Sequence, residues 1–136
     1  MTDIVVDTSA VVAILGNEPT AQELIDVIDS SDRRLVSAAT LVELGIVMEA
    51  RLGAAGGSIV DRFIRDGEIT VVAVDRHHAD RAIEGWRRFG KGRHAAALNL
   101  GDCFTYGLAV ASNMPILCTG EDFAQTDADV VARPAG

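Results

Sequence analysis

Acidic side chains recur in this chain at the ends of apolar segments, where a charged group is costly. Asp7 directly follows the apolar run 4–6, and Thr8 and Ser9 then open a helical stretch. An ionised carboxylate at the tip of a buried strand must be hydrogen-bonded, paired or bound to a metal, and open α/β sheets place their ligand sites at such tips. Asp7 is therefore a candidate site residue. The alternative is that it only caps the following helix, accepting backbone N–H bonds from Ser9 or Ala10.

Further acids lie in comparable settings. Glu43 lies within the apolar stretch 38–48, so on a helix it projects from a largely apolar face and either belongs to a site or is buried against an arginine. Asp102 falls in the first turn of an expected helix, where the helix dipole favours a negative charge by about 0.3–1 kcal/mol. An ordinary first-turn Asp fits that position equally well. Glu121 and Asp122 follow another apolar run.

Such acids, brought together, would favour metal chemistry. Carboxylates a few ångströms apart repel one another by several kcal/mol in a partly dehydrated site, and a shell of Asp and Glu oxygens suits Mg²⁺ or Mn²⁺. Open coordination positions can take a phosphate oxygen and an attacking water, which predicts metal-assisted phosphodiester hydrolysis. Three other classes of phosphate-handling protein fit poorly. A haloacid-dehalogenase-type phosphatase would have a second Asp at position 9, which is Ser9, and a response-regulator receiver domain would have a lysine after a late strand, whereas the only lysine, Lys91, lies in a glycine loop. A P-loop nucleotide hydrolase would have a GxxxxGK[ST] motif, which is absent.

The elements that would position these acids follow from alternating apolar patterns. Short β-branched runs alternate with longer helical stretches, which is typical of a parallel sheet. Gly53, Gly67 and Gly90 stand where helices should end. We predict an α/β fold with a central, mainly parallel sheet of four to five short strands flanked by helices. The expected strands are 4–6, 35–36, 69–74 and 116–118, with a short fifth at 130–131; the expected helices are 9–15, 20–30, 38–52, 55–66, 76–89 and 102–112.

Length and composition bound the class of protein. The chain has 136 residues, 49% of them hydrophobic, which predicts a single domain over residues 1–136. Neither a signal peptide nor an apolar run long enough to span a membrane is visible, so we expect a cytoplasmic protein. Cys103 and Cys118 form no CxxC pair, which argues against zinc and redox motifs and favours two core residues.

The charge is unevenly distributed. The formal net charge is −8, yet residues 75–94 hold six bases against three acids and are locally positive by three. This basic strip is either a solvated helix face or a contact for phosphates. His77, His78 and His94 have no metal-binding spacing and are expected at the surface, and Trp86 is expected to pack against its helix. The bases of the strip are Arg76, Arg81, Arg87, Arg88, Lys91 and Arg93.

Four segments in this order resemble the motifs of PIN-domain ribonucleases, in particular the VapC toxins of bacterial toxin–antitoxin pairs. They are Ile-Val-Val-Asp-Thr-Ser-Ala at 4–10, Ser-Ala-Ala-Thr-Leu-Val-Glu at 37–43, Leu-Asn-Leu-Gly-Asp-Cys-Phe-Thr-Tyr at 98–106 and Thr-Gly-Glu-Asp-Phe at 119–123. The resemblance covers essentially the whole chain and implies a single PIN-like nuclease domain.

The resemblance also implies a set of site residues. It assigns the metal-binding, catalytic acids to Asp7, Glu43 and Asp102. A fourth acid is expected at Asp122, with Glu121 and Asp127 as alternatives. Thr8, Ser9 and Thr119 would support these acids by hydrogen bonds, and RNA phosphates would contact the basic residues Arg87, Arg88, Lys91 and Arg93.

The implied function is that of a type II toxin. Such a protein is a Mg²⁺- or Mn²⁺-dependent endoribonuclease that cleaves cellular RNA with a metal-activated water. A VapB-like antitoxin would insert a segment over the acidic centre, the toxin would form a homodimer, and the complex would bind its own promoter through the antitoxin. Two alternatives stay open: a non-catalytic PIN-like module that binds RNA or protein, and a metal-dependent nuclease or phosphohydrolase acting on DNA or small phosphates.

Overall fold

The computed structural model describes residues 2–132. Within them, a four-stranded parallel sheet has the order β3-β2-β1-β4. Its strands are β1 (Ile4–Val6), β2 (Arg34–Ser37), β3 (Thr70–Val72) and β4 (Ile116–Leu117). Val5 of β1 lies opposite Leu35 on one side and Ile116 on the other, so β1 is an interior strand.

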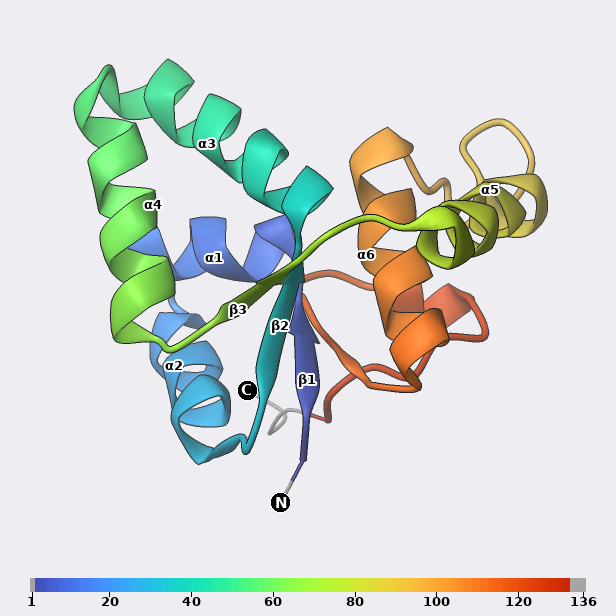
Figure 1. Cartoon of the computed structure of the whole chain (residues 1–136), viewed down its shortest axis with the longest axis horizontal. Helices are drawn as coiled ribbons and strands as arrows, with labels where there is room; N and C mark the ends of the chain where they lie inside the picture. Colours follow the sequence, from blue (N-terminus) through green and yellow to red (C-terminus); the bar gives the residue numbers. More distant parts are fainter. Residues whose placement is uncertain (1, 133–136) are drawn as a thin grey trace.

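Helices cover both faces of the sheet, as Figure 1 shows. Val5 packs into a core with α5 and α6, whereas Ile4 and Val6 pack into a second core with α1 to α4. Because β1 is buried on both faces, it reads as a continuous apolar run. The helices are α1 (Thr8–Leu15), α2 (Ala21–Ser30), α3 (Ala38–Leu52), α4 (Ala55–Asp66), α5 (Arg76–Phe89) and α6 (Leu100–Ser112), and a 3₁₀ turn, η1, spans Phe123–Gln125.

The predicted α/β class and parallel sheet are confirmed. The expected bounds of α3, α4 and α5 match the structure, and Gly53, Gly67 and Gly90 follow their last residues. The expected strand at 69–74 is too long, because pairing with β2 covers only 70–72.

The C-terminal segment differs from the expectation. Residues 130–131 do not form a fifth strand: Val130 makes only an isolated parallel bridge to Ile116.

Cys103 and Cys118 are buried, as expected. None of the helices within residues 2–132 is long and apolar enough to cross a membrane.

Two glycines bring α5 and α6 close together. A Cβ on Gly107 would lie 2.7 Å from the backbone oxygen of His78, and one on Gly85 would lie 2.5 Å from a ring carbon of Tyr106. These distances leave no room for a methyl group unless the helices move apart. The close contact matters for function because α6 carries Asp102 and Thr105.

We expect Gly107→Ala to destabilise the fold by about 1–3 kcal/mol, since overpacking a tight contact forces backbone shifts. Gly45→Ala is the matched control, because a Cβ on that helical glycine would meet no atom within 4 Å. The control should be neutral or stabilising by about 0.5–1 kcal/mol. Urea unfolding monitored by circular dichroism measures both. Equal midpoints for the two variants would contradict the steric interpretation.

Candidate functional site

Asp7 occupies the tip of the interior strand and is almost fully buried, with 4% of its surface exposed. Its Oδ2 accepts hydrogen bonds from the backbone N–H of Ser9 (3.0 Å) and the Ser9 hydroxyl (2.7 Å). Its Oδ1 accepts one from the hydroxyl of Thr105 on α6 (2.7 Å). Asp7 therefore does cap α1, but a bond from a second helix shows that capping is only part of its role.

Ser9 connects Asp7 to the far end of the chain. Its hydroxyl donates to Asp7 and accepts a hydrogen bond from the backbone N–H of Thr119, at 3.1 Å. The expected supporting residues Ser9 and Thr119 thus lie beside Asp7, although Thr119 takes part through its backbone. This bond joins the end of β1 to the segment that follows β4.

Thr105 has a second hydroxyl neighbour on another helix. Its Oγ1 lies 3.3 Å from the Oγ1 of Thr40 in the first turn of α3. Thr105 is 0% exposed and Thr40 is 1% exposed. Three elements, β1, α3 and α6, are therefore linked by polar side chains beneath the surface.

Glu43 is half-buried on α3 and is held by Thr8. The Thr8 hydroxyl donates a 2.6 Å hydrogen bond to Glu43 Oε1, and no ion pair joins Glu43 to an arginine among the described residues. On its other side, Glu43 Oε2 lies so close to Gly101 that a Cβ at that position would overlap it. Glu43 therefore faces the beginning of α6, which carries Asp102.

Asp102 forms a reciprocal cap with Asn99. The Asp102 N–H donates to Asn99 Oδ1 (2.8 Å), and the Asn99 N–H donates to Asp102 Oδ2 (3.0 Å). Burial raises the pKa of Asp102 to about 6, against the Asn99 hydrogen bond, which lowers it; the charges of Asp7, Asp122 and Glu43 raise it further. The ordinary first-turn role is thus present, and the three other acids are near enough for their charges to act on Asp102.

The three candidates for the fourth acid lie in different surroundings. Asp122 is exposed at the start of η1, and its charge acts on Asp102. Asp127 instead accepts hydrogen bonds from the Tyr106 hydroxyl (2.7 Å) and Arg88 (2.9 Å). Burial acts to raise the pKa of Asp127, but these two bonds and the Arg88 charge lower it overall. Asp127 thus belongs to a structural ion pair. Glu121 is exposed, and its backbone oxygen accepts a bond from Gln125.

The donor set suits a hard divalent cation, since all four acids offer oxygen. Within residues 2–132, however, no three His, Cys, Asp or Glu side chains are already arranged so that they could hold a metal ion together. The hydrogen bonds orient Asp7 and Glu43, while repulsion disfavours closer approach. A cation would offset that repulsion by drawing the carboxylates together.

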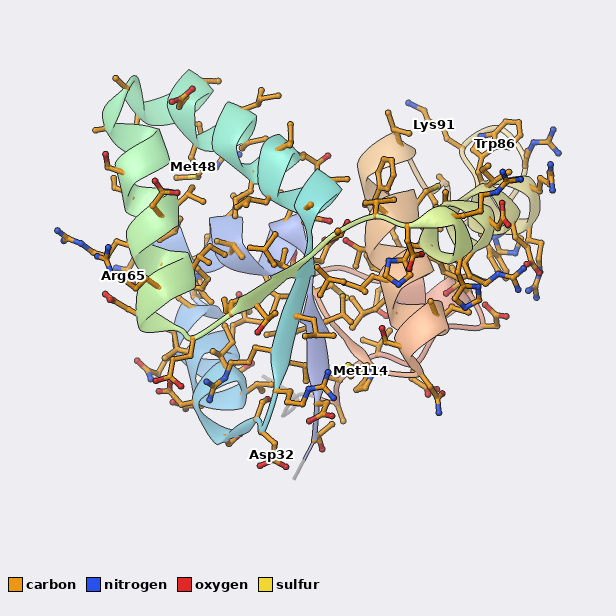
Figure 2. The ribbon with its side chains drawn as sticks, viewed as in Figure 1. Asp32, Met48, Arg65, Trp86, Lys91 and Met114 are labelled. Carbon is orange, nitrogen blue, oxygen red and sulfur yellow. The ribbon has the colours of Figure 1, made fainter. Side chains whose placement is uncertain are left out.

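The basic strip is less uniform than the sequence suggests. Arg88 pairs with Asp127 at 2.9 Å, and the Arg93 guanidinium lies 4.2 Å above the Trp86 ring. Among the described residues, Arg87 and Lys91 enter no ion pair. Figure 2 shows Lys91 and Trp86 on the same end of the molecule, opposite Arg65. Arg87 and Lys91 are thus the freest cations of the strip.

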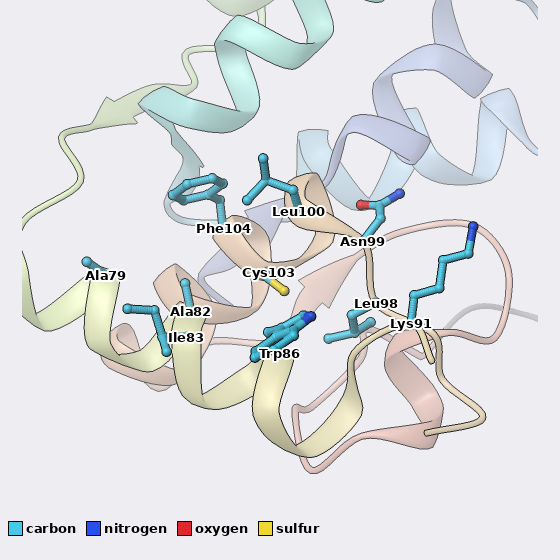
Figure 3. A pocket seen from close by; sticks show the side chains of 10 residues that line it. All are labelled: Ala79, Ala82, Ile83, Trp86, Lys91, Leu98, Asn99, Leu100, Cys103 and Phe104. Carbon is cyan, nitrogen blue, oxygen red and sulfur yellow. The ribbon is translucent and has the colours of Figure 1, made fainter. Parts of the chain in front are cut away.

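Lys91 borders an apolar groove between α5 and the start of α6. The groove has a volume of about 650 Å³ and is lined mainly by apolar side chains, including Ile83, Leu100 and Phe104. Figure 3 shows the Lys91 side chain beside Asn99, which caps the helix of Asp102. The groove therefore adjoins the acidic centre.

Two surface expectations need correction. Trp86 does not simply pack against its helix: 43% of it is exposed, and it lines the apolar groove. His78 is half-buried, with Nδ1 3.2 Å from the Ala73 oxygen. His94 is exposed as expected, but its Nδ1 accepts the Ala96 N–H, which gives the ring a role in the loop.

Sequence reasoning missed four residues that shape the site. Asn99 could have been found, because Asn-x-x-Asp matches a capping-box pattern. Thr105, Gly101 and Thr40 gave no comparable signal, because their contacts, with Asp7, Glu43 and Thr105 respectively, join distant parts of the chain.

Comparisons with known proteins agree with this geometry. A family model for the PIN domain matches residues 4–129. Ribonuclease VapC30 of Mycobacterium tuberculosis is 45% identical over 131 residues, covering 96% of this chain and all of the relative. Ribonuclease VapC of Mycolicibacterium smegmatis is 45% identical over 128 residues, covering 94% of this chain and 99% of the relative.

Solved structures share the fold at lower identity. VapC20 of M. tuberculosis, described as a Sarcin-Ricin loop cleaving toxin, superposes with a TM-score of 0.76 at 20% identity, covering 97% of this chain and 100% of that one. A chain of a DNA-bound VapBC complex from Salmonella typhimurium superposes with a TM-score of 0.72 at 17% identity, covering 97% of this chain and 98% of that one. The fold, the ordered acids and the full-length similarity lead to one conclusion: this chain belongs to the PIN-domain family and, within it, to the VapC ribonucleases.

Proposed function

We propose that this protein is a divalent-metal-dependent endoribonuclease, the toxin of a VapBC-type pair, built as one PIN-like domain over residues 1–136. The observation that carries the proposal is the position of Asp102, whose burial and whose three acidic neighbours, Asp7, Asp122 and Glu43, raise its pKa to about 6. A cluster of acids with a perturbed pKa is typical of a functional site, and a bound cation would offset its negative charge. Relatives of 45% identity over nearly the whole chain are named ribonucleases.

Asp7, Glu43, Asp102 and Asp122 would hold Mg²⁺ or Mn²⁺. When bound there, the cation would supply Lewis acidity for phosphodiester hydrolysis and would make water more acidic. The net reaction is hydrolysis: water oxygen bonds to phosphorus, and the leaving oxygen departs with a proton. Ser9 and Thr8 keep Asp7 and Glu43 oriented through the hydrogen bonds described above, and Thr119 supports Ser9 through its backbone N–H.

The basic strip would bind the RNA backbone beside this centre. Arg87 and Lys91 are the strongest candidates, because no described acid pairs with them. Arg93 and Arg88 would contribute less: one guanidinium stacks on Trp86, and the other is largely neutralised by its ion pair. Phosphate contacts of this kind position RNA without reading its sequence.

The partners would be a VapB-like antitoxin and a second copy of the toxin. Apolar side chains are unusually exposed near the acidic centre: Leu100 is 76% exposed, Ile46 64% and Val42 62%. Large exposed apolar surfaces mark protein contacts. Structural neighbours include VapBC complexes solved with DNA, one with a fragment of their promoter, which supports promoter binding through the antitoxin. A toxin that cleaves cellular RNA would act in the cytoplasm.

Asp7→Asn and Asp102→Asn should each reduce RNA cleavage by about 10²–10³-fold, because each removes a charge that the cation requires. Asp61→Asn, an exposed acid on α4, is the control and should cleave like wild type. RNA, single-stranded DNA and a phosphomonoester are assayed in parallel with Mg²⁺ and Mn²⁺. Cleavage of DNA or the phosphomonoester in preference to RNA would favour the phosphohydrolase alternative, and no cleavage of any substrate would favour a binding module.

Arg87→Gln combined with Lys91→Gln should weaken RNA binding and reduce the slope of log affinity against log salt by about 0.7 per lost contact. Arg62→Gln with Arg65→Gln on α4 removes the same charge elsewhere and should leave the slope unchanged. Fluorescence anisotropy with a labelled RNA, in Asp7→Asn protein so that RNA stays intact, gives the slopes. Equal slopes for both pairs would make the strip a solvated face.

Metal-free wild type should lose stability relative to Asp102→Asn as the pH rises from about 4 through 6. The folded protein holds the Asp102 proton more tightly than the unfolded chain does. Protonation of Asp102 therefore contributes fully to the free energy of unfolding below pH ~4, and this contribution is lost as the pH rises above the raised pKa. Asn keeps an acceptor for the Asn99 N–H but cannot ionise. Thermal unfolding in EDTA between pH 4 and 7 compares the two proteins, and parallel curves would contradict the raised pKa.

A further inference from the structure

We propose that Thr40 and Thr105 form a one-directional hydroxyl relay that positions Asp7 Oδ1 to receive the divalent cation. Thr105 would then position a metal ligand, in addition to packing in the core. The proposal rests on the proposed metal-binding role of Asp7, and it adds which oxygen of Asp7 binds and what orients that oxygen.

The direction of the relay follows from proton counting. A hydroxyl has one proton to donate, and an ionised carboxylate can only accept. Thr105 must therefore give its proton to Asp7 Oδ1, at 2.7 Å. The neighbouring contact of 3.3 Å can then be a hydrogen bond only if Thr40 donates to Thr105.

The same counting separates the two oxygens of Asp7. A carboxylate oxygen has two lone-pair sites. Oδ2 already accepts from the Ser9 N–H and the Ser9 hydroxyl, so both of its sites are in use. Oδ1 accepts only from Thr105 among the described residues, which leaves one site. The open site belongs to Oδ1, and the Thr105 hydroxyl determines its direction.

Burial makes this orientation strict. Thr40, Thr105 and Asp7 are 1%, 0% and 4% exposed, so water cannot easily replace a missing hydroxyl. Thr40 and Thr105 lie on α3 and α6, the helices that also carry Glu43 and Asp102. The relay therefore fixes the orientation of the Asp7 carboxylate relative to α3 and α6, the helices that carry Glu43 and Asp102.

The test is Mn²⁺ binding to metal-free protein, measured by calorimetry, for Thr105→Val, Thr105→Ser and Thr40→Val. Thr105→Val keeps the side-chain volume without the hydroxyl and should weaken binding by about 10–100-fold, the usual effect of removing a group that orients a ligand. Thr105→Ser should bind within about threefold of wild type. Thr40→Val should lie between wild type and Thr105→Val, and adding it to Thr105→Val should cause no further loss.

Controls separate the relay from general destabilisation. Ser31→Ala removes a buried hydroxyl bond to Val27 on α2, so it should lower the melting temperature and leave Mn²⁺ affinity unchanged. Circular dichroism verifies that each variant is folded; if Thr105→Val is not, Thr40→Val and Thr105→Ser decide the outcome. High Mn²⁺ should restore RNA cleavage by Thr105→Val.

Three results would overturn the proposal. Binding by Thr105→Val within twofold of wild type would make the threonines structural only. Independent, multiplying losses from Thr40→Val and Thr105→Val would show that they do not act in series. Wild type that binds no Mn²⁺ would remove the metal centre itself, and so reject the proposed function together with the relay, whereas the first two results leave that function intact.

Discussion

The burial of one carboxylate, Asp7, is the constraint on which the rest of the structure depends. A buried charge needs partners, and here they come from the beginning of α1 and from the second turn of α6. Ser9, which serves Asp7, also binds the backbone after β4. The need to satisfy one charge therefore draws together the central strand, two helices and the C-terminal segment.

The other acids impose an opposite demand. Glu43 and Asp102 each have a hydrogen-bond donor, Thr8 and Asn99 respectively, but burial and the charges of the three other acids raise the pKa of Asp102. The fold compensates elsewhere through two apolar cores and the close contact of α5 with α6 at Gly107. This division is typical of sites that give up stability for function.

The sequence predicted features that are encoded locally. Glycines that follow helices, apolar runs and first-turn acids each act within a few residues, so the helix bounds and the placement of Asp102 could be anticipated. Thr105, in contrast, contacts Asp7 across 98 positions of the chain, and Arg88 contacts Asp127 across 39. Periodicity carries no information about such pairs. The error at 69–74 has a similar cause, since the extent of a strand depends on its partner strand.

The parallel pairing of β1 with β4 has a consequence for protein synthesis. β1 is made first, but its neighbour at Ile116 and the Thr119 N–H that binds Ser9 are made more than a hundred residues later. Long-range parallel pairings form slowly and late. A nascent chain on the ribosome therefore holds Asp7 without the neighbours that complete its surroundings. The site around Asp7 can therefore be completed only after nearly the whole of this chain has been made.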